Sequence, residues 1–200
     1  PQKYIEPDSP RGQGDWSNAA FFLCAGALGG ETEITGLSLD SRQSDRALTD
    51  ILKAFGAAIK CGSSVSVCKS ELFGITVDIS QCPDLFPTLA VTACAAHGDT
   101  VFTNAARLRI KESDRIESVE KMITSLGGFA ESTPDSLTVH GTGTLAGGEV
   151  NSFNDHRIVM AAAVAACICE SPVVIRDAQA VNKSYPDFFE DYKKLGGKAD

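Results

Sequence analysis

The densest group of charged side chains in this sequence lies at 109–115, which reads Arg-Ile-Lys-Glu-Ser-Asp-Arg. Two or three cations beside a carboxylate suit an anionic substrate, and Lys111 and Glu112 are also able to move a proton. The plainer interpretation is a solvated helix start, in which Ser113 or Asp114 caps the helix and the other charges face water. The segment taken alone favours this plainer interpretation.

Three other predicted helix starts carry side chains that are able to bind a substrate or transfer a proton. Asp155 lies two residues before Arg157, and Asp84 follows a proline, so both aspartates are predicted N-caps. Lys183 lies shortly before Pro186, which favours a helix start there, although a lone lysine at such a place is usually exposed. Helix N-termini attract anions through unpaired N–H groups and the helix dipole. These signals indicate an anion site if the fold gathers the helix starts on one face.

The elements that would position these residues recur about every 70 residues. Asp15, Asp84 and Asp155 each precede an apolar helix rich in small residues. These helices are predicted at 17–28, 86–96 and 158–168, and the strands that follow them at 32–35, 100–103 and 173–176. Helices that are apolar on all sides must be buried, so the helices are expected inside and the sheets outside.

Each unit also carries a second, amphipathic helix that opens at a polar loop and ends at glycine. The polar loops lie at 41–46, 109–115 and 182–187, and β-rich pieces follow in the first two units at 65–68, 75–79, 137–140 and near 150. The third unit lacks such pieces and falls about 25 residues short of the period. We therefore predict an α/β fold of three βαβαββ-like units around a pseudo-threefold axis, with the third unit incomplete.

The domain is predicted at 15–200, and the proline- and charge-rich segment 1–14 is interpreted as a crossover linker from another domain. The net charge of −8 argues against nucleic-acid or anionic-membrane partners. The apolar run 161–168 is far shorter than the roughly 20 residues that span a bilayer. The seven cysteines are odd in number and mostly lie in apolar stretches, so no metal site is expected. These features predict a soluble protein of the cytoplasm.

Read together, the motifs resemble the EPSP synthase family. The matching segments are Gly-Asp-Trp-Ser-Asn-Ala-Ala-Phe-Phe at 14–22, Pro-Asp-Leu-Phe-Pro at 83–87, Arg-Leu-Arg-Ile-Lys-Glu-Ser-Asp-Arg at 107–115, Asn-Asp-His-Arg-Ile at 154–158 and Lys-Ser-Tyr-Pro-Asp-Phe-Phe at 183–189. The resemblance implies a shikimate-pathway enzyme of aromatic amino-acid and chorismate biosynthesis. It has two domains with the active site between them, of which this chain is the C-terminal half. Strands from the absent N-terminal half would complete the third unit.

The activity that the resemblance implies is transfer of the enolpyruvyl group of phosphoenolpyruvate to the 5-hydroxyl of shikimate 3-phosphate, with release of phosphate. The 5-hydroxyl adds to C2 while C3 is protonated, and loss of a C3 proton then expels phosphate. This addition–elimination needs acid and base groups and cations around an anionic centre, but no metal or organic cofactor. The isolated chain is predicted to be inactive, since it would hold about half of the site.

The resemblance also implies roles for single residues. Asp84 matches the carboxylate that contacts the 5-hydroxyl and is a candidate base. Lys111 matches a lysine that binds shikimate 3-phosphate and shares acid–base work. Glu112 matches the carboxylate near the phosphoenolpyruvate methylene, a candidate for its proton transfers.

Three more cations match residues that bind phosphoenolpyruvate. Arg115 and Arg157 match the pair that holds this substrate, and a guanidinium suits a carboxylate bidentately. Lys183 matches a further contact and candidate proton donor. The role of His156 stays open, and no role is carried over to Arg107. We expect these cations to form a local positive patch.

Two other functions remain open. UDP-N-acetylglucosamine enolpyruvyl transferase shares the fold and reaction type, but the Lys-Glu-Ser-Asp-Arg and Ser-Tyr-Pro-Asp-Phe-Phe segments favour the shikimate enzyme. A non-catalytic ligand-binding module made of three repeats is the alternative from another class.

Overall fold

The structure is a computed structural model and describes residues 12–200. The predicted linker 1–14 therefore lies outside the described residues, apart from its last three positions. None of the helices within 12–200 is long and apolar enough to cross a membrane.

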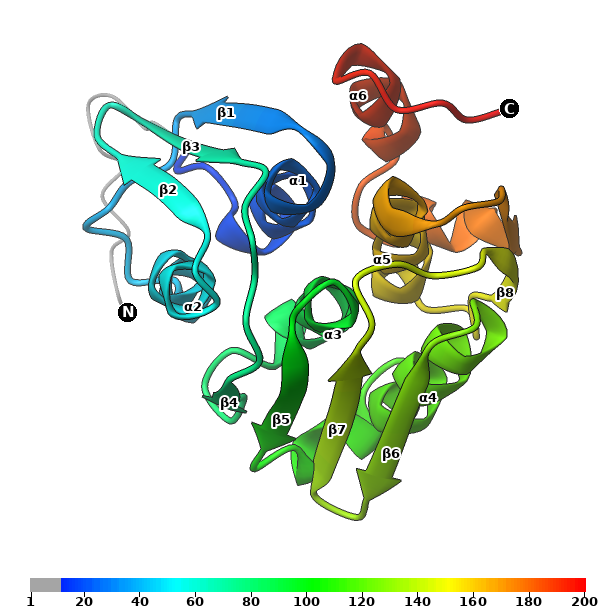
Figure 1. Cartoon of the computed structure of the whole chain (residues 1–200). Helices are drawn as coiled ribbons and strands as arrows, with labels where there is room; N and C mark the ends of the chain where they lie inside the picture. The colour runs from blue at the N-terminus through cyan, green and yellow to red at the C-terminus, as the bar shows by residue number, and fades with distance from the viewer. Residues whose placement is uncertain (1–11) are drawn as a thin grey trace, which may run out of the picture.

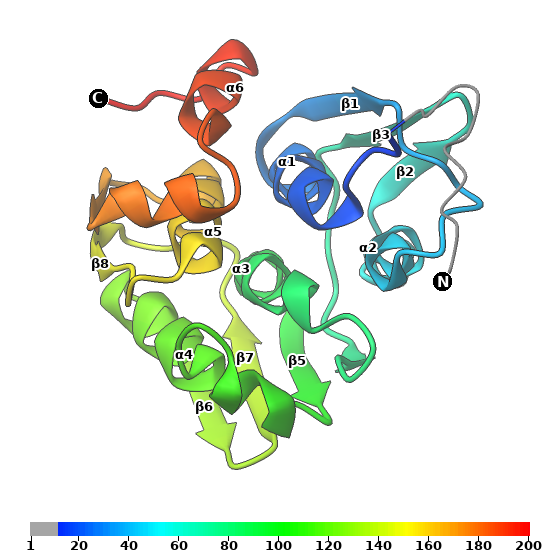
Figure 2. The ribbon, with the colours of Figure 1, turned by 180° about the vertical axis from the view of Figure 1, so that it is seen from behind.

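Three apolar helices pack against one another at the centre of the fold: α1 (Trp16–Gly29), α3 (Phe86–Cys94) and α5 (His156–Ala165). Figures 1 and 2 show them from opposite sides, surrounded by the sheets. Every residue of α3 and of α5 is buried. This confirms the prediction of buried inner helices, and alanines in all three allow their axes to approach closely.

The strands form three outer sheets. The first holds β1 (Glu31–Thr35), β3 (Ser64–Cys68) and β2 (Ala58–Cys61), in that order and antiparallel. The second has the order β4 (Thr76–Asp78), β5 (Gly98–Thr103), β7 (Ser136–Gly141) and β6 (Phe129–Thr133). The third pairs β8 (Gly148–Asn151) with β9 (Val173–Arg176).

Equivalent hydrogen bonds relate the three units. β4 pairs in parallel with β5, and β8 with β9, so a strand that follows one unit in the sequence joins the sheet of the next. Just beyond these pairs, Ile79 N–H donates to the carbonyl of Thr103 at 3.1 Å and Ser152 N–H to that of Arg176 at 3.3 Å. In the first unit, Gly14 N–H donates to the carbonyl of Gly36 at 3.1 Å. Within residues 12–200 the second sheet has four strands and the third has two, which agrees with the predicted incomplete third unit.

The second helix of each unit follows a polar loop and a 3-10 turn. The helices are α2 (Leu48–Ala54), α4 (Arg115–Ser125) and α6 (Phe188–Lys194), and the 3-10 turns are η1 (Ser44–Ala47), η3 (Ala106–Ile110) and η5 (Ala178–Lys183). Shortly after the last residue of each helix comes a glycine, Gly56, Gly127 or Gly196, with φ of 97°, 83° and 95° respectively. In each case the next N–H turns back to a carbonyl of the last turn, as in Gly128 to Ile123 at 2.9 Å. Glycine is suited to this left-handed stop, as predicted.

Some element boundaries differ from those predicted. The inner helix α3 ends two residues early, and α5 ends at Ala165, beyond which η4 (Ala166–Ile168) continues as a 3-10 turn. Strands β2 and β6 were not predicted. Both form the first arm of a hairpin and are mostly exposed. Their sequences therefore lack the alternation of apolar and polar residues that predicts a half-buried strand.

Candidate active site

Arg115 is the centre of the predicted cluster. It is the first residue of α4, and its side chain is fully buried. Nε donates to Oδ2 of Asp155 at 2.9 Å, and Nη1 to Oδ1 of Asp84 at 2.7 Å. Nη2 donates to Oε2 of Glu112 at 2.5 Å. One guanidinium thus joins the starts of three helices, because Asp84 precedes α3 and Asp155 precedes α5.

Asp84 is shared among three cations. Besides Arg115, it accepts from Nη2 of Arg157 at 3.1 Å and lies 3.6 Å from Nζ of Lys111. Arg157 Nη1 also donates to the Asp84 main-chain carbonyl at 3.3 Å. Burial acts to raise the pKa of Asp84, but Arg157, Arg115 and Lys111 outweigh it and hold that pKa below its ordinary value. The carboxylate is therefore held ionised between two buried guanidinium groups.

The predicted cap role of Asp84 is wrong. Asp84 lies in the 3-10 turn η2 (Pro83–Leu85), and its side chain caps no N–H of α3. The Phe86 N–H donates to the carbonyl of Pro83, and Pro87 has no N–H to donate. The Asp84 carboxylate instead binds Arg115 and Lys111 of its own unit and Arg157 of the third unit.

Asp155 is an N-cap, as predicted. Its Oδ1 accepts from the backbone N–H of Arg157 at 2.9 Å. Its Oδ2 accepts from Arg115 and from the Ser113 hydroxyl, the latter at 3.1 Å, and the side chain is fully buried. Burial acts to raise the pKa of Asp155, but the hydrogen bond and charge of Arg115 and the Arg157 N–H lower it below its ordinary value.

Two residues of the 109–115 segment point elsewhere. Asp114 caps α4 by accepting from Glu117 N–H at 3.1 Å, which agrees with the plainer interpretation of this segment. Arg109 binds Asp114 at 2.8 Å and donates to the main-chain carbonyls of Thr133 and Pro134. The segment therefore splits into a structural part and a part that joins the cluster.

Lys183 lies beside the cluster without contacting its carboxylates. It is the last residue of η5, and its exposed Nζ donates to the main-chain carbonyl of Asn154 at 2.6 Å, directly before Asp155. The predicted helix start at Pro186 is two residues early, because α6 begins at Phe188. Lys183 is thus hydrogen-bonded next to the start of α5, and the helix that it was expected to precede begins farther along the chain, at Phe188.

The expected positive patch contains carboxylates among its cations and stays a prediction. Lys111, Arg115 and Arg157 each lie against a carboxylate, and the carboxylates belong to Asp84, Glu112 and Asp155. Lys183, the fourth cation, donates to a main-chain carbonyl instead.

Two buried residues beside the cluster were missed or left open. The His156 side chain is buried, its Nδ1 has no hydrogen-bond partner, and burial together with Arg157 lowers its pKa. Asp45 is buried and accepts from the Ser17 hydroxyl; burial raises its pKa, and the nearby charge of Asp84 adds to the shift.

Asp45 also lines a polar hollow of about 350 Å³ together with Asp84 and Arg107. The sequence held a signal for it, since Ser-Asp-Arg occurs both at 44–46 and at 113–115, in equivalent loops of two units.

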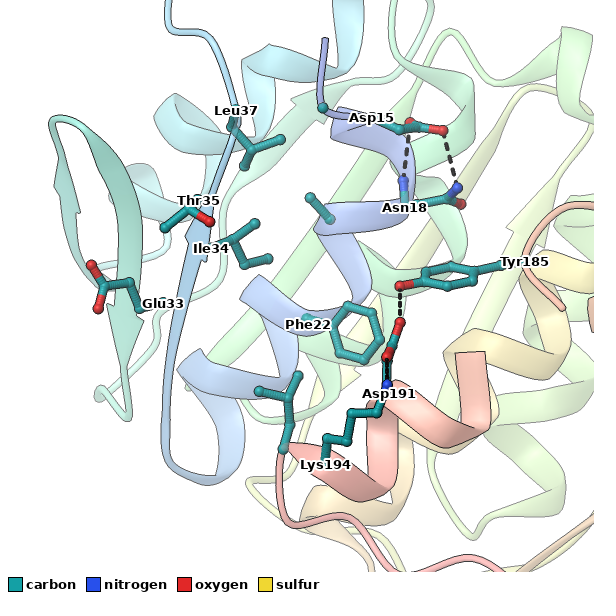
Figure 3. A pocket seen from close by; sticks show the side chains of 13 residues that line it. Asp15, Asn18, Phe22, Glu33, Ile34, Thr35, Leu37, Tyr185, Asp191 and Lys194 are labelled. Carbon is teal, nitrogen blue, oxygen red and sulfur yellow. Dashed lines mark hydrogen bonds and ion pairs between the residues drawn. The ribbon is translucent and has the colours of Figure 1, made fainter. Parts of the chain in front are cut away.

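A larger cavity of about 640 Å³ lies away from the cluster, between α1, β1 and α6 (Figure 3). Its apolar lining includes Phe22 and Ile34, and Tyr185 donates there to Asp191 at 2.7 Å. None of the six predicted site residues lines it. The candidate site is therefore the charged cluster and not this cavity.

Comparison with known proteins places this cluster in context. A family model described as EPSP synthase (3-phosphoshikimate 1-carboxyvinyltransferase) matches residues 5–192. The chain belongs to the EPSP synthase family. It is 47% identical over 191 residues to a 3-phosphoshikimate 1-carboxyvinyltransferase of Clostridium novyi, a match that covers 95% of the chain and 44% of the relative. A relative with the same description from Clostridium acetobutylicum is 48% identical over 185 residues, which are 92% of the chain and 43% of the relative.

A solved EPSP synthase structure from Acinetobacter baumannii has a TM-score of 0.82 and 29% identity to this chain. The match covers 91% of this chain and 46% of that one. The prediction of the fold class is confirmed. The chain spans less than half the length of each of these EPSP synthase family members.

Proposed function

We propose that this chain forms one wall of the active site of a 3-phosphoshikimate 1-carboxyvinyltransferase. The complete enzyme would transfer the enolpyruvyl group of phosphoenolpyruvate to the 5-hydroxyl of shikimate 3-phosphate and release phosphate. The observation that carries the proposal is the cluster around Arg115, which joins three helix starts in a member of the EPSP synthase family. A cytoplasmic location and the absence of nucleic-acid or membrane partners belong to the same proposal, and the net charge of −8 supports the absence of such anionic partners.

Asp84 and Lys111 are assigned to the shikimate 3-phosphate side of the site. The Asp84 carboxylate accepts the proton of the 5-hydroxyl as the oxygen attacks C2 of phosphoenolpyruvate. Lys111, 3.6 Å from Asp84, holds the same hydroxyl and shares in the proton transfer. Because three cations lower the pKa of Asp84, a substrate that draws one of them away would make the carboxylate a stronger base.

Arg115, Arg157 and Lys183 are assigned to phosphoenolpyruvate. Nη2 of Arg115 is occupied by Glu112, whose side chain is 43% exposed, so the substrate carboxylate binds Arg115 by replacing that of Glu112. This exchange of one carboxylate for another keeps the charge balance of the buried guanidinium. It also releases Glu112, whose exposed carboxylate takes up a proton from water and adds it to C3. The carboxylate left by that transfer accepts the C3 proton in the elimination step, as phosphate leaves. Lys183 contacts phosphoenolpyruvate and is the candidate donor of a further proton.

The remainder of the enzyme is proposed to complete the third unit. In the second sheet β5 is paired on both sides, and Phe102 on it is fully buried. In the third sheet, β8 is the one strand of the described part of the chain that pairs with β9, and Ile175, at the equivalent register position, is half-buried. Ile175, Phe189 and Tyr192 line a groove of about 320 Å³ beside β9. A two-stranded hairpin from the N-terminal half fits this groove, as β7 and β6 lie beside β5.

A chimera tests the proposed function. The chain replaces the matching 44% of the Clostridium novyi relative, and purified chimera is mixed with phosphoenolpyruvate and either shikimate 3-phosphate or UDP-N-acetylglucosamine. With phosphoenolpyruvate present, we expect phosphate release and an enolpyruvyl product when shikimate 3-phosphate is the acceptor and not when UDP-N-acetylglucosamine is. We expect no turnover by the isolated chain. Turnover with UDP-N-acetylglucosamine would favour the related transferase. A folded chimera that turns over neither acceptor would favour a non-catalytic module.

A further inference from the structure

Asp15 and Asp155 have the same local role but different surroundings. Each caps an inner helix, and Asp15 accepts from Ser17 N–H at 2.8 Å much as Asp155 accepts from Arg157 N–H at 2.9 Å. The second oxygen of Asp15 accepts from the Asn18 side chain at 3.0 Å and the residue is exposed. The second oxygen of Asp155 binds Arg115 and Ser113, and the residue is fully buried. Capping alone therefore requires neither burial nor an arginine.

The guanidinium of Arg115 has one closed side and one open side. On the Nε side its partner Asp155 is 0% exposed, and both oxygens of that carboxylate are hydrogen-bonded. On the Nη side its partners Asp84 and Glu112 are 33% and 43% exposed. A ligand carboxylate can exchange with the exposed partners, whereas no ligand reaches the Nε side.

We infer that Asp155 is the positioning residue of Arg115, with Ser113 as its support. Asp155 holds Nε from behind, so that Nη1 and Nη2 face the open side in a fixed orientation. The part of this inference that concerns phosphoenolpyruvate binding rests on the proposed function. The part that concerns the hydrogen bond between Asp155 and the Arg115 guanidinium does not depend on that function.

The test compares Asp155→Asn with Asp15→Asn, which makes the same chemical change at an equivalent cap. In Asp155 the Arg157 N–H and the Arg115 Nε–H bind different oxygens. An asparagine at position 155 replaces one of these oxygens with an NH2 group, so one of the two donors loses its acceptor. In the 200-residue chain, the Arg115 Nε–H signal is followed by NMR and its exchange with solvent is measured. We expect exchange at least about tenfold faster in Asp155→Asn and unchanged in Asp15→Asn.

The second measurement is the kinetics of the chimera. Asp155→Asn should raise KM for phosphoenolpyruvate about tenfold or more, with a smaller change in kcat and in KM for shikimate 3-phosphate. Asp15→Asn should leave all three constants near those of the parent. A purely structural role of Asp155 would lower the amount of folded enzyme without this selective change in KM.

Two results would overturn the inference. One is equal Nε–H exchange in Asp155→Asn and Asp15→Asn, and the other is an unchanged KM for phosphoenolpyruvate in a folded Asp155→Asn chimera. If Asp155→Asn does not fold, Ser113→Ala decides, because it removes one of the two donors to Oδ2: faster Nε–H exchange supports the inference and unchanged exchange overturns it. An inactive parent chimera would count against the proposed function, while the NMR comparison would still decide the hold of Asp155 on Arg115.

Discussion

Asp84 and Asp155, which precede equivalent inner helices of neighbouring units, are bridged by the single guanidinium of Arg115, at 2.7 Å and 2.9 Å. The bridge converts a repeated structural position into a charged site. In the first unit the equivalent Asp15 bonds to Asn18 instead, and Arg46, which occupies the position of Arg115 in the repeated Ser-Asp-Arg, is only half-buried. The repeats thus supply the positions, and differences between the repeats create the site.

Removing the bridge should destabilise the chain strongly. Arg115→Met leaves the buried Asp155 carboxylate without its cation, which costs about 3–5 kcal/mol of unfolding free energy. Urea unfolding followed by circular dichroism measures the loss. Arg176→Met is the matched control, because Arg176 binds Glu149 through two nitrogens on the surface and its loss should matter far less. A loss of unfolding free energy in Arg115→Met as small as that in Arg176→Met would show that the buried bridge contributes little.

The pH dependence of stability should carry the signature of Asp155. Its folded pKa lies below the unfolded value, so its contribution is present above the unfolded pKa and is lost as the pH falls through the folded pKa. The difference in unfolding free energy between the parent and Asp155→Asn should therefore be constant near neutral pH and shrink as the pH falls below 3.8. Urea unfolding at a series of pH values measures it. A difference that stays constant down to pH 2 would contradict the shift.

Asp45 should behave in the opposite sense. Its folded pKa is raised by burial, so its contribution is favourable below the unfolded pKa and is lost as the pH rises through the folded pKa. Asp84, Arg157 and Asp15 are the charges that act on it. Asp45→Asn keeps an acceptor for the Ser17 hydroxyl and removes the buried charge, so it should raise Tm at pH 7 and lose this advantage below pH 3.8. A lower Tm at pH 7 would show that the ionised carboxylate is needed.

Arg157 should act on binding more than on turnover. Arg157→Ala in the chimera is expected to raise KM for phosphoenolpyruvate roughly 10- to 100-fold, because a charge-assisted contact to the substrate is lost. Steady-state kinetics with each substrate varied in turn measures the effect. Arg109→Ala is the control, since Arg109 binds Asp114 and the β6–β7 hairpin away from the cluster. Similar increases in KM for both variants would remove the specific role of Arg157.

Local features of the sequence were sufficient to predict the repeat and its inner helices. Asp155 caps its helix and Asp15 precedes its helix, both as expected, and the glycine stops at positions 56, 127 and 196 follow from the left-handed backbone that they adopt. These features depend on neighbours within a few residues. The short third unit was also predictable, because the length of a period is visible in the sequence alone.

The contacts within the site could not be predicted in this way. Arg115 and Asp84 are 31 residues apart, and Arg157 and Asp84 are 73 residues apart, so their pairing depends on how the second unit folds and how it packs against the third. The same packing surrounds the Asp84 carboxylate with cations and places carboxylates among the cations of the expected positive patch. The resemblance to the family identified the candidate site residues, but only the structure shows that the Glu112 carboxylate binds Nη2 of Arg115.

The central claim, that the Arg115 cluster carries out proton transfer at C3 of phosphoenolpyruvate, is tested most directly by isotope exchange. The chimera is incubated in deuterium oxide with phosphoenolpyruvate and shikimate 3-phosphate, and deuterium at the methylene carbon is measured by NMR. The account predicts exchange by the parent and a roughly 100-fold or greater loss in Glu112→Gln, which keeps the shape of the side chain and loses the proton transfer. Undiminished exchange in Glu112→Gln, or none in a folded parent chimera, would contradict it.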